Sequence, residues 1–225
     1  MTTTEPDTKP ASPAWIARPT IGTAWLAVAG HILDHGTPGS WDGVPLTEVL
    51  RATLDVDAPA VTDPIIDRYA DPERLAWMHA NFTDASRVAE LDHADSYATR
   101  LYDYARSGRN QIDWVIDHIR NDPATRNATI TTLQPLTDTT YIPCVSLLDF
   151  WLAEDALHLG VYAHGIDFGT KGYANLVELA ALQHHVADAL GKAVGSLAFT
   201  VKSAHIYDTE RSRMGAICAA VARPA

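Results

Sequence analysis

The sequence predicts an α+β (mixed α/β) domain in which helices pack against one mixed β-sheet. Apolar residues recur at helical spacing in some segments, whereas in others they alternate with polar residues. These two patterns indicate amphipathic helices and half-buried strands, respectively. Several predicted strands also follow one another along the chain without an intervening helix, which favours a mixed sheet over a purely parallel one.

The first half of the chain contains three segments with a clear pattern. Residues 20–35 are apolar enough for a strand or a helix that ends at Gly36. Residues 47–56 alternate imperfectly but carry enough β-branched residues to favour a strand. Residues 71–82 favour a helix, because Asp71 is a good N-cap and a proline follows it at the first helical position.

The second half contains the clearest amphipathic helix, at residues 110–120, where isoleucine and valine residues fall on one face. A longer helix is predicted at residues 174–190, ending near Gly191. The predicted strands of this half lie at residues 128–133, 144–152, 157–168 and 196–203.

The composition indicates a soluble globular protein with one core. Hydrophobic residues make up 47% of the chain and charged residues 20%, and 225 residues suffice for a sizeable core. We expect a single domain at residues 16–225. A tail at residues 1–15, rich in Thr, Pro, Asp and Ser, is expected to be disordered.

Charge and cysteine content exclude several classes of function. The net charge of −11 argues against non-specific binding of nucleic acid, which requires a cationic surface. No apolar run approaches the ~20 residues of a membrane span, and the N-terminus lacks the features of a signal peptide. The two cysteines, Cys144 and Cys218, are too few for a disulfide framework, so we expect a reducing, cytoplasmic environment.

Three short segments carry the residues best suited to chemistry. Cys144 follows a proline at the start of an apolar strand, and Asn175 lies where a glycine-bearing loop turns into a helix. That loop also contains Asp167. The third segment, SAHIYDTE, supplies His205 and Tyr207.

Each of these residues also has a purely structural interpretation. Cys144 could be a buried core cysteine, the commoner role for this residue type. Asp167 could be a turn residue and Asn175 the N-cap of its helix. His205 and Tyr207 could be polar core residues with satisfied hydrogen bonds. Their joint occurrence favours a functional site.

Together, in this order and spacing, these segments resemble the thymidylate synthase family, especially its shorter archaeal-type members. The resemblance covers roughly residues 97–207, and SYATRLYDY, RNDPATRNATI and LHLGVYAHGID resemble further family motifs. It implies a thymidylate synthase-like fold with one mixed, twisted sheet flanked by helices. It also implies a homodimer packed face to face through its sheets, with shared active sites.

The resemblance implies how a pyrimidine would be bound. The Cys144 thiolate would add to C6 of the ring, as in covalent catalysis by an activated thiol. The Asn175 side-chain amide would bind the O4 and N3 edge of the base. Related hydroxymethylases that act on cytosine usually carry an aspartate here, so Asn175 favours uracil. His205 and Tyr207 would hydrogen-bond the sugar hydroxyl.

The resemblance also implies a folate site and a proton path. Asp167, with Gly172 in the same loop, would bind 5,10-methylenetetrahydrofolate as co-substrate. Tyr97 and Glu48 would organise the water that moves protons to and from C4 and C5. Glu48 is placed by LTEVLRATLDVDAP, which resembles the archaeal-type stretch that carries an essential glutamate. No metal site is expected.

The chain departs from the family where a nucleotide's phosphate would bind. Four arginines hold the phosphate in the family, two of them as a tandem pair from the partner subunit. That pair is Arg126 and Asn127 here, while His164 replaces a further arginine and Gly165 a serine. Charge-assisted hydrogen bonds contribute about 1.5–3 kcal/mol each. Losing two would weaken nucleotide binding by roughly two to four orders of magnitude.

Either other cations replace these arginines or the substrate lacks a 5′-phosphate. The candidate replacements are Arg100, Arg106, Arg109 and Lys171. The substitution at His164 also affects the thiol, because the family arginine lies near it. A protonated His164 could lower the pKa of Cys144, a neutral one could act as a base toward it, or the residue could be a polar filler.

The leading expectation is a folate-dependent C5 methyl- or hydroxymethyltransferase that acts on a uracil-type pyrimidine nucleoside or nucleotide. The altered phosphate site favours specialised metabolism, such as biosynthesis of a nucleoside natural product. One alternative is an ordinary archaeal-type thymidylate synthase that acts on deoxyuridine monophosphate. Another is a non-catalytic nucleoside-binding homologue.

Overall fold

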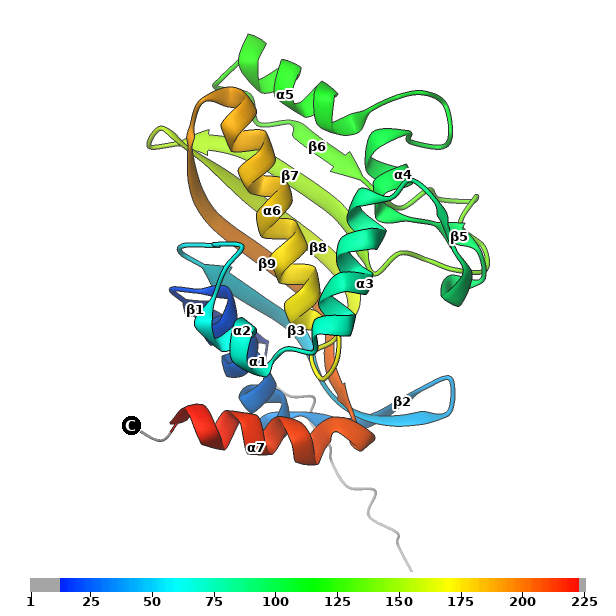
Figure 1. The fold of residues 1–225 in the computed structure, drawn as a ribbon, viewed down its shortest axis with the longest axis vertical. Coiled ribbons are helices and arrows are strands. Elements are labelled where there is room, and N and C mark those ends of the chain that lie inside the picture. Colours follow the sequence, from blue (N-terminus) through cyan, green and yellow to red (C-terminus); the bar gives the residue numbers. More distant parts are fainter. Residues whose placement is uncertain (1–12, 223–225) are drawn as a thin grey trace, which may run out of the picture.

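A seven-stranded mixed sheet with helices along one face forms the centre of the computed structural model, which describes residues 13–222 (Figure 1). The strands are β1 (Ala14–Arg18), β2 (Thr37–Trp41), β3 (Val44–Val56), β4 (Arg87–Val88), β5 (Ala94–Asp95), β6 (Ala128–Thr131), β7 (Val145–Ala153), β8 (Ala156–Asp167) and β9 (Ala193–Tyr207). The helices are α1 (Ile21–His35), α2 (Pro64–Tyr69), α3 (Pro72–Thr83), α4 (Tyr97–Tyr102), α5 (Gln111–Asn121), α6 (Gly172–Leu190) and α7 (Arg211–Ala222). Two short 3₁₀ turns lie at Ala89–Leu91 and Asp208–Glu210.

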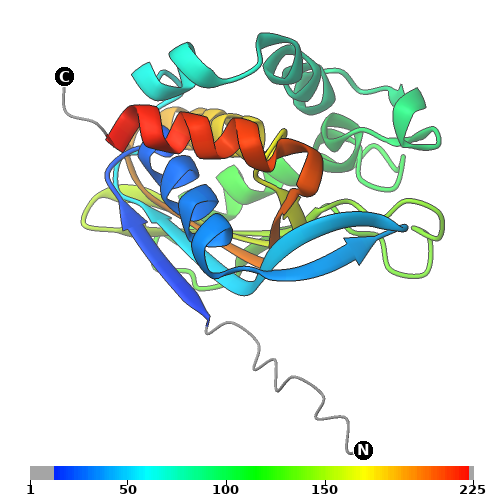
Figure 2. The same cartoon turned by 90° about the horizontal axis from the view of Figure 1, so that it is seen from below.

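The sheet combines parallel and antiparallel pairs, as the sequence predicts. Its strand order is β1-β3-β9-β8-β7-β6, with β2 pairing to β3 off this path, while β4 and β5 form a separate two-stranded sheet. The pairs β1–β3 and β8–β9 are parallel and the others are antiparallel. Helices α1, α6 and α7 lie on one side of the sheet (Figure 2), whereas the opposite face bears no helix within residues 13–222.

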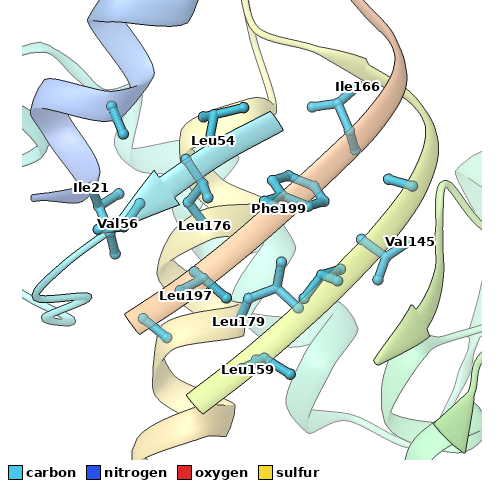
Figure 3. Packing of buried hydrophobic residues seen from close by; sticks show 14 of the residues in the cluster. Ile21, Leu54, Val56, Val145, Leu159, Ile166, Leu176, Leu179, Leu197 and Phe199 are labelled. Carbon is cyan, nitrogen blue, oxygen red and sulfur yellow. The ribbon is translucent and has the colours of Figure 1, made fainter. Parts of the chain in front are cut away.

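The core lies between this helical layer and the three central strands. Side chains of α1 and α6, such as Ile21 and Leu176, meet inward-facing side chains of β3, β9 and β8, among them Leu54, Phe199 and Leu159 (Figure 3). Burying one such side chain contributes about 1.5–3 kcal/mol. This packing holds α6, whose first turn carries Asn175, against the strands.

Local signals in the sequence locate two helices, α3 and α5, and the segment at residues 20–35, expected as a strand or a helix, is a helix. Residues 20–35 form α1, which starts at a capping box between Thr20 and Thr23 and ends before Gly36. Asp71 caps α3 as predicted, its carboxylate accepting from the N–H of Glu73. The apolar stripe of residues 110–120 is the buried face of α5.

Two boundaries differ from the prediction because strand pairing extends them. The last strand was expected to end at residue 203, but β9 continues to Tyr207 because it pairs with β3 along its length. Ala14 and Trp15 were expected in the tail, but they belong to β1, which pairs with Ala52 and Thr53. The rest of the predicted tail, residues 1–12, lies outside the described residues.

Three neighbouring strands interrupt their alternation of buried and exposed residues at the same level, at a feature we call the kink. Elsewhere along these strands, every second residue is buried. At the kink, two consecutive residues that are not buried lie between one buried residue and the next. The buried rows on either side of the kink are Ala163–Val201–Ala52 and Ile166–Ala204–Val49. Arg51 lies between these rows with a φ of 62°. Such bulge-like irregularities re-aim the side chains beyond them.

Candidate active site

Cys144 lies directly before β7 and its backbone is held from two sides. Its carbonyl oxygen accepts a 2.9 Å hydrogen bond from the N–H of His164 on β8. The N–H of the next residue, Val145, donates to the Tyr97 hydroxyl at 2.9 Å. These two bonds and the buried Pro143 fix the position of the thiol.

Two side chains counteract the effect of burial on this thiol. Burial raises the pKa of Cys144 above its usual value, and the Lys171 ammonium and a hydrogen bond from Tyr141 offset this rise only in part. Burial also raises the pKa of Tyr141 far above its usual value, so its hydroxyl stays protonated and can donate. The sequence pattern missed Tyr141 and considered Lys171 only as a phosphate ligand. Tyr141 lies three residues before Cys144 and Lys171 lies at the start of α6. Neither residue belongs to a recognisable sequence motif.

Tyr97 is buried at the start of α4, with its ring against Phe82. Ser96 caps this helix, and Asn81 of α3 accepts from the Tyr97 backbone N–H at 3.0 Å. Because its hydroxyl accepts from Val145, the hydroxyl proton remains free for a ligand or water. Burial raises the pKa of Tyr97 well above its usual value, so it can act as a proton donor but not as a phenolate base.

Asn175 lies in the first turn of α6 and is oriented by the helix itself. Its Nδ2 donates to the backbone carbonyl of Lys171 at 3.0 Å. No other protein group within residues 13–222 bonds to its side chain, which leaves Oδ1 and one N–H for a ligand. The N-cap position belongs to Lys171, so the interpretation of Asn175 as an N-cap is wrong.

Asp167 ends β8 and organises the loop that leads into α6. Its Oδ1 accepts from the N–H of Gly169 at 2.8 Å and its Oδ2 from the Thr170 hydroxyl. The turn role considered for Asp167 is thus present, yet each carboxylate oxygen keeps a lone pair for a further donor. Arg213 of α7 fixes the same loop by donating to the Gly169 carbonyl.

Gly172 has a packing role that accounts for its small size. A Cβ at this position would lie 2.6 Å from Cδ1 of Phe168, which is too close for any side chain. Phe168 is fully buried and its carbonyl accepts from the Trp25 indole at 2.8 Å. Gly172 therefore allows α6 to start close to the core.

His205 and Tyr207 lie near the end of β9. His205 pairs with Glu48 on β3 and with Asp167 on β8, and its ring meets that of Tyr207 edge-on at 5.2 Å. Burial lowers the pKa of His205, while Asp167, the Ser203 carbonyl and Glu48 act in the opposite direction. Burial and the charges of Asp167 and Cys144 raise the pKa of Tyr207. The effect of Cys144 means that Tyr207 lies on the same side of the site as the thiol.

Glu48 accepts a hydrogen bond from the Ser203 hydroxyl. This contact and its pairing with His205 place it at the sugar-binding pair proposed from the sequence. No bond joins Glu48 to Tyr97 or Asn175 within residues 13–222. The shared water network predicted for Glu48 and Tyr97 therefore has no direct contact to support it.

His164 has no cationic role in this arrangement. Its Nε2 is buried without a hydrogen-bond partner, and burial, followed by the charge of Lys202, lowers its pKa. The imidazole is therefore largely neutral at pH 7. Of the interpretations considered for His164, thiolate stabilisation by a protonated ring is disfavoured, and Lys171 is the cation that acts on Cys144.

Arg126 and Asn127 lie just before β6 and bond to nearby parts of the chain, Asn127 also meeting His118 of α5 at 3.5 Å. The Arg126 guanidinium donates to the carbonyls of Ala124 and Thr125. Asn127 accepts from the Thr125 hydroxyl at 2.5 Å. Within residues 13–222 neither residue forms a hydrogen bond with Cys144, Asn175 or His205.

The other candidate cations are held elsewhere. Arg100 is 2% exposed and forms a bidentate ion pair with Asp138, with both N–O distances at 2.8 Å. Arg106 pairs with Asp95, and Arg109 is exposed in a turn. Arg100 and Tyr141 also line a polar cavity of about 260 Å³. Because Tyr141 hydrogen-bonds the Cys144 thiol, this cavity lies beside the candidate site.

Metal chemistry has no donor set in this region. No group of three or more His, Cys, Asp or Glu side chains within residues 13–222 is arranged to hold a metal ion. Nor is any helix in that range long and apolar enough to cross a membrane.

Comparisons with known proteins give matches to one family. A family model described as thymidylate synthase matches residues 61–223. A "Putative thymidylate synthase" of Methanococcoides burtonii is 30% identical over 199 residues, covering 84% of this chain and 87% of its own. Another protein of that description, from Methanosarcina acetivorans, is 31% identical with the same coverage.

The fold has a counterpart among solved structures. Thermostable thymidylate synthase A from Bacillus subtilis superposes with a TM-score of 0.71 at 16% identity, covering 89% of this chain and 84% of the other. The chain belongs to the thymidylate synthase family, whose members are one-carbon transferases. The family and the α+β fold predicted from the sequence motifs are thereby confirmed.

Proposed function

We propose that the protein is a folate-dependent C5 methyl- or hydroxymethyltransferase that acts on a uracil-type pyrimidine nucleoside or nucleotide through a covalent adduct at Cys144. Membership of the thymidylate synthase family supports the general reaction, a one-carbon transfer to C5 of a pyrimidine. The observation that carries the proposal is the arrangement around Lys171, whose ammonium acts on Cys144 while its carbonyl orients Asn175.

The orientation of Asn175 supports uracil as the base. Its Nδ2 is committed to the Lys171 carbonyl, so a flipped amide would place Oδ1 against another acceptor. In this orientation Oδ1 can accept from N3–H of uracil, and the second N–H of the amide can donate to O4. Cytosine carries an acceptor at N3 and a donor at C4, which mismatches both groups.

The residues around the thiol have separable roles in this reaction. The Cys144 thiolate, favoured by Lys171 and Tyr141, forms a bond to C6 and shifts an electron pair toward C5, which then bonds to the one-carbon unit. Tyr97 can donate a proton to a water beside the ring. Loss of the C5 proton would then expel the folate nitrogen from the one-carbon unit and leave an exocyclic methylene on C5. Hydride from the reduced folate, for a methyl product, or water, for a hydroxymethyl product, would add to that carbon as the thiolate leaves C6 and the ring double bond is restored.

A folate co-substrate fits the donor set at the start of α6. Methylenetetrahydrofolate would supply the one-carbon unit. Asp167 would bind it, because both carboxylate oxygens retain lone pairs for the paired N–H donors of a pterin. Gly172 would contribute by keeping the helix start close to this carboxylate.

We also propose that the protein forms a homodimer through the sheet face that bears no helix. Large side chains on these strands are exposed, among them Trp15 at 70%, Leu147 at 38% and Tyr162 at 37%. In such a dimer Arg126 would reach the partner's site. Sedimentation of the purified protein as a monomer at micromolar concentration would remove the basis for this role of Arg126.

Specialised metabolism is the biological setting we propose, in the cytoplasm, where a reactive thiol stays reduced. The departures at Asn127, His164 and Gly165 support it, because they alter the end of the site away from the base. The second candidate, an ordinary thymidylate synthase acting on deoxyuridine monophosphate, is favoured by the described activity of the archaeal relatives. Rescue of a thymidine auxotroph would support this second candidate.

Release of tritium from C5 tests the reaction class. The protein should release tritium from at least one of uridine, deoxyuridine or their monophosphates in the presence of methylenetetrahydrofolate, and the cytosine counterparts should react more slowly. Cys144→Ser should abolish release, while Cys218→Ser, which alters the other free cysteine, should not. Absence of release from every compound, with a thiol of ordinary pKa, would instead indicate a non-catalytic binding protein.

A further inference from the structure

The Lys171 side chain starts at the N-cap of α6 and is met by an aromatic ring from another helix. Its ammonium lies over the ring of Trp77 on α3, with Nζ 5.4 Å from the ring centroid. Within residues 13–222 Lys171 forms no ion pair. Because lysine has a long and flexible stem, the aromatic face is what restricts the position of this ammonium.

Trp77 projects from the face of α3 that is turned toward the thiol. Residues four apart on a helix share a face, so Trp77 lies one turn from Asn81 on the same side of α3. The Asn81 side chain accepts from the N–H of Tyr97, and both residues line a narrow hollow that reaches Pro143. Pro143 directly precedes Cys144, so this face of α3 borders the nucleophile.

Helix α3 is fixed against α6 on both sides of Trp77. Before Trp77, the N–H of Asp71 donates to the Tyr173 hydroxyl at 3.2 Å. After it, Nδ1 of His79 meets a carboxylate oxygen of Glu178 at 3.2 Å. The two helices lie side by side along this stretch (Figure 1). The Trp77 ring is therefore carried by a docked helix and offers a fixed surface to the mobile lysine.

Lys171 is the charged group that opposes burial at the thiol. Among the groups that shift the pKa of Cys144, Lys171 alone carries a charge, because Tyr141 acts through its hydroxyl. Tyr97 and Tyr207 also lie near enough to interact with the thiol, but burial raises their pKa values, so both stay neutral at pH 7. A Coulomb interaction weakens with distance and with exposure to water. An ammonium free to range into solvent would thus act less on the thiol.

We propose that Trp77 is a positioning residue, which holds the Lys171 ammonium on the side of α6 that faces Cys144 and thereby favours the thiolate. This inference rests on the proposed function and adds to it a residue that acts on the thiol only through another side chain. Two consequences distinguish this role from a merely structural one. Loss of the ring should change the pH dependence of the thiol, and the change should vanish when Lys171 is absent.

The pH profile of alkylation by iodoacetamide tests the proposal. The Cys218→Ser protein serves as the parent, because it retains Cys144 as its single thiol. Trp77→Ala should move the profile to higher pH and slow alkylation at pH 7 about threefold to tenfold. Trp77→Phe keeps an aromatic face and should retain part of the effect. Lys171→Met should shift the profile at least as far, and Trp77→Ala added to it should shift it no further.

His79→Ala is the matched control, because it breaks another contact between α3 and α6 without touching Lys171. It should leave the alkylation profile unchanged. Three results would each overturn the positioning role: an unchanged profile in Trp77→Ala, an equal shift in His79→Ala, or a further shift when Trp77→Ala is added to Lys171→Met.

Tritium release from C5, measured on the same proteins, separates this inference from the proposed function. Trp77→Ala should lower release at pH 7 and recover toward the parent value at higher pH, where the thiolate forms without help. Release by the parent with no effect of Trp77→Ala on either readout overturns the positioning role alone. Absence of release from every compound overturns the proposed function, while the alkylation profile still decides whether Trp77 acts on the thiol through Lys171.

Discussion

The Tyr97 hydroxyl accepts a 2.9 Å hydrogen bond from the backbone N–H of Val145, the residue that follows Cys144. Tyr97→Phe would leave that buried N–H without a partner. We expect the free energy of unfolding to fall by about 1–3 kcal/mol, together with a loss of turnover. Urea unfolding and tritium release measure the two effects. Tyr102→Phe, at a partly exposed tyrosine of the same helix, should change neither, and an unaltered Tyr97→Phe protein would contradict the assignment.

Lys171 occupies the N-cap of α6, a position where a cation is unfavourable. Lys171→Ser would introduce a better cap and remove positive charge from the helix N-terminus, at the expense of the contact with the Trp77 ring at 5.4 Å. We expect a net gain of about 0.5–1 kcal/mol in unfolding free energy. The pKa of Cys144 should rise, so its alkylation at neutral pH should slow. A stabilised protein with an unchanged pH profile of alkylation would exclude Lys171 as the activating cation.

The ion pair between Arg100 and Asp138 is buried and bidentate. Asp138→Asn would leave the Arg100 charge uncompensated, which costs about 3–5 kcal/mol for a buried pair. Urea unfolding checks this expectation. Asp155→Asn provides the matched control, because its partner Lys192 is more exposed and surface pairs contribute less than about 1 kcal/mol. Similar losses in both variants would show that burial does not distinguish the pairs.

Asp63 makes the stability of the fold depend on pH. Burial raises its pKa, but hydrogen bonds from Thr20 and from the N–H groups of Gly22, Ile65 and Ile66 outweigh burial and lower it below the usual 3.8. A carboxyl with a lowered pKa stabilises the folded state above its unfolded pKa, and the contribution is lost as the pH falls through the folded pKa. Asp63→Asn should therefore cost about 1–3 kcal/mol at pH 7 and progressively less below about pH 4. Urea unfolding at pH 7 and pH 3 measures the difference, and an equal cost at both values would contradict it.

Elements with local signals could be predicted from the sequence, whereas those set by pairing could not. The cap at Asp71 acts within one turn, so a short window reveals it. The extension of β9 to Tyr207 depends on β3, about 150 residues away, and no window contains both. Helix α7 was missed because its sequence is rich in small residues and only Met214 is buried, which leaves no apolar stripe.

The candidate site divides in the same way. Residues carried by family motifs, such as Cys144, Asn175 and His205, could be proposed because their order and spacing are recognisable. Tyr141 and Lys171 have no such motif, and their relevance to Cys144 follows only from which strands and loops meet. His164 replaces a family arginine, and the sequence alone allows it to carry the same positive charge. Its burial, which the sequence does not reveal, lowers its pKa and disfavours that charge.

The kink across β8, β9 and β3 constrains how this chain can evolve. Because side chains alternate with a period of two, inserting or deleting one residue in a single strand would turn every side chain beyond that point to the opposite face. His205 and Tyr207 would then point into the core, and Ile206 into the site. Relatives that keep this chemistry should therefore carry their length differences in loops, while these three strands keep a common length through the kink.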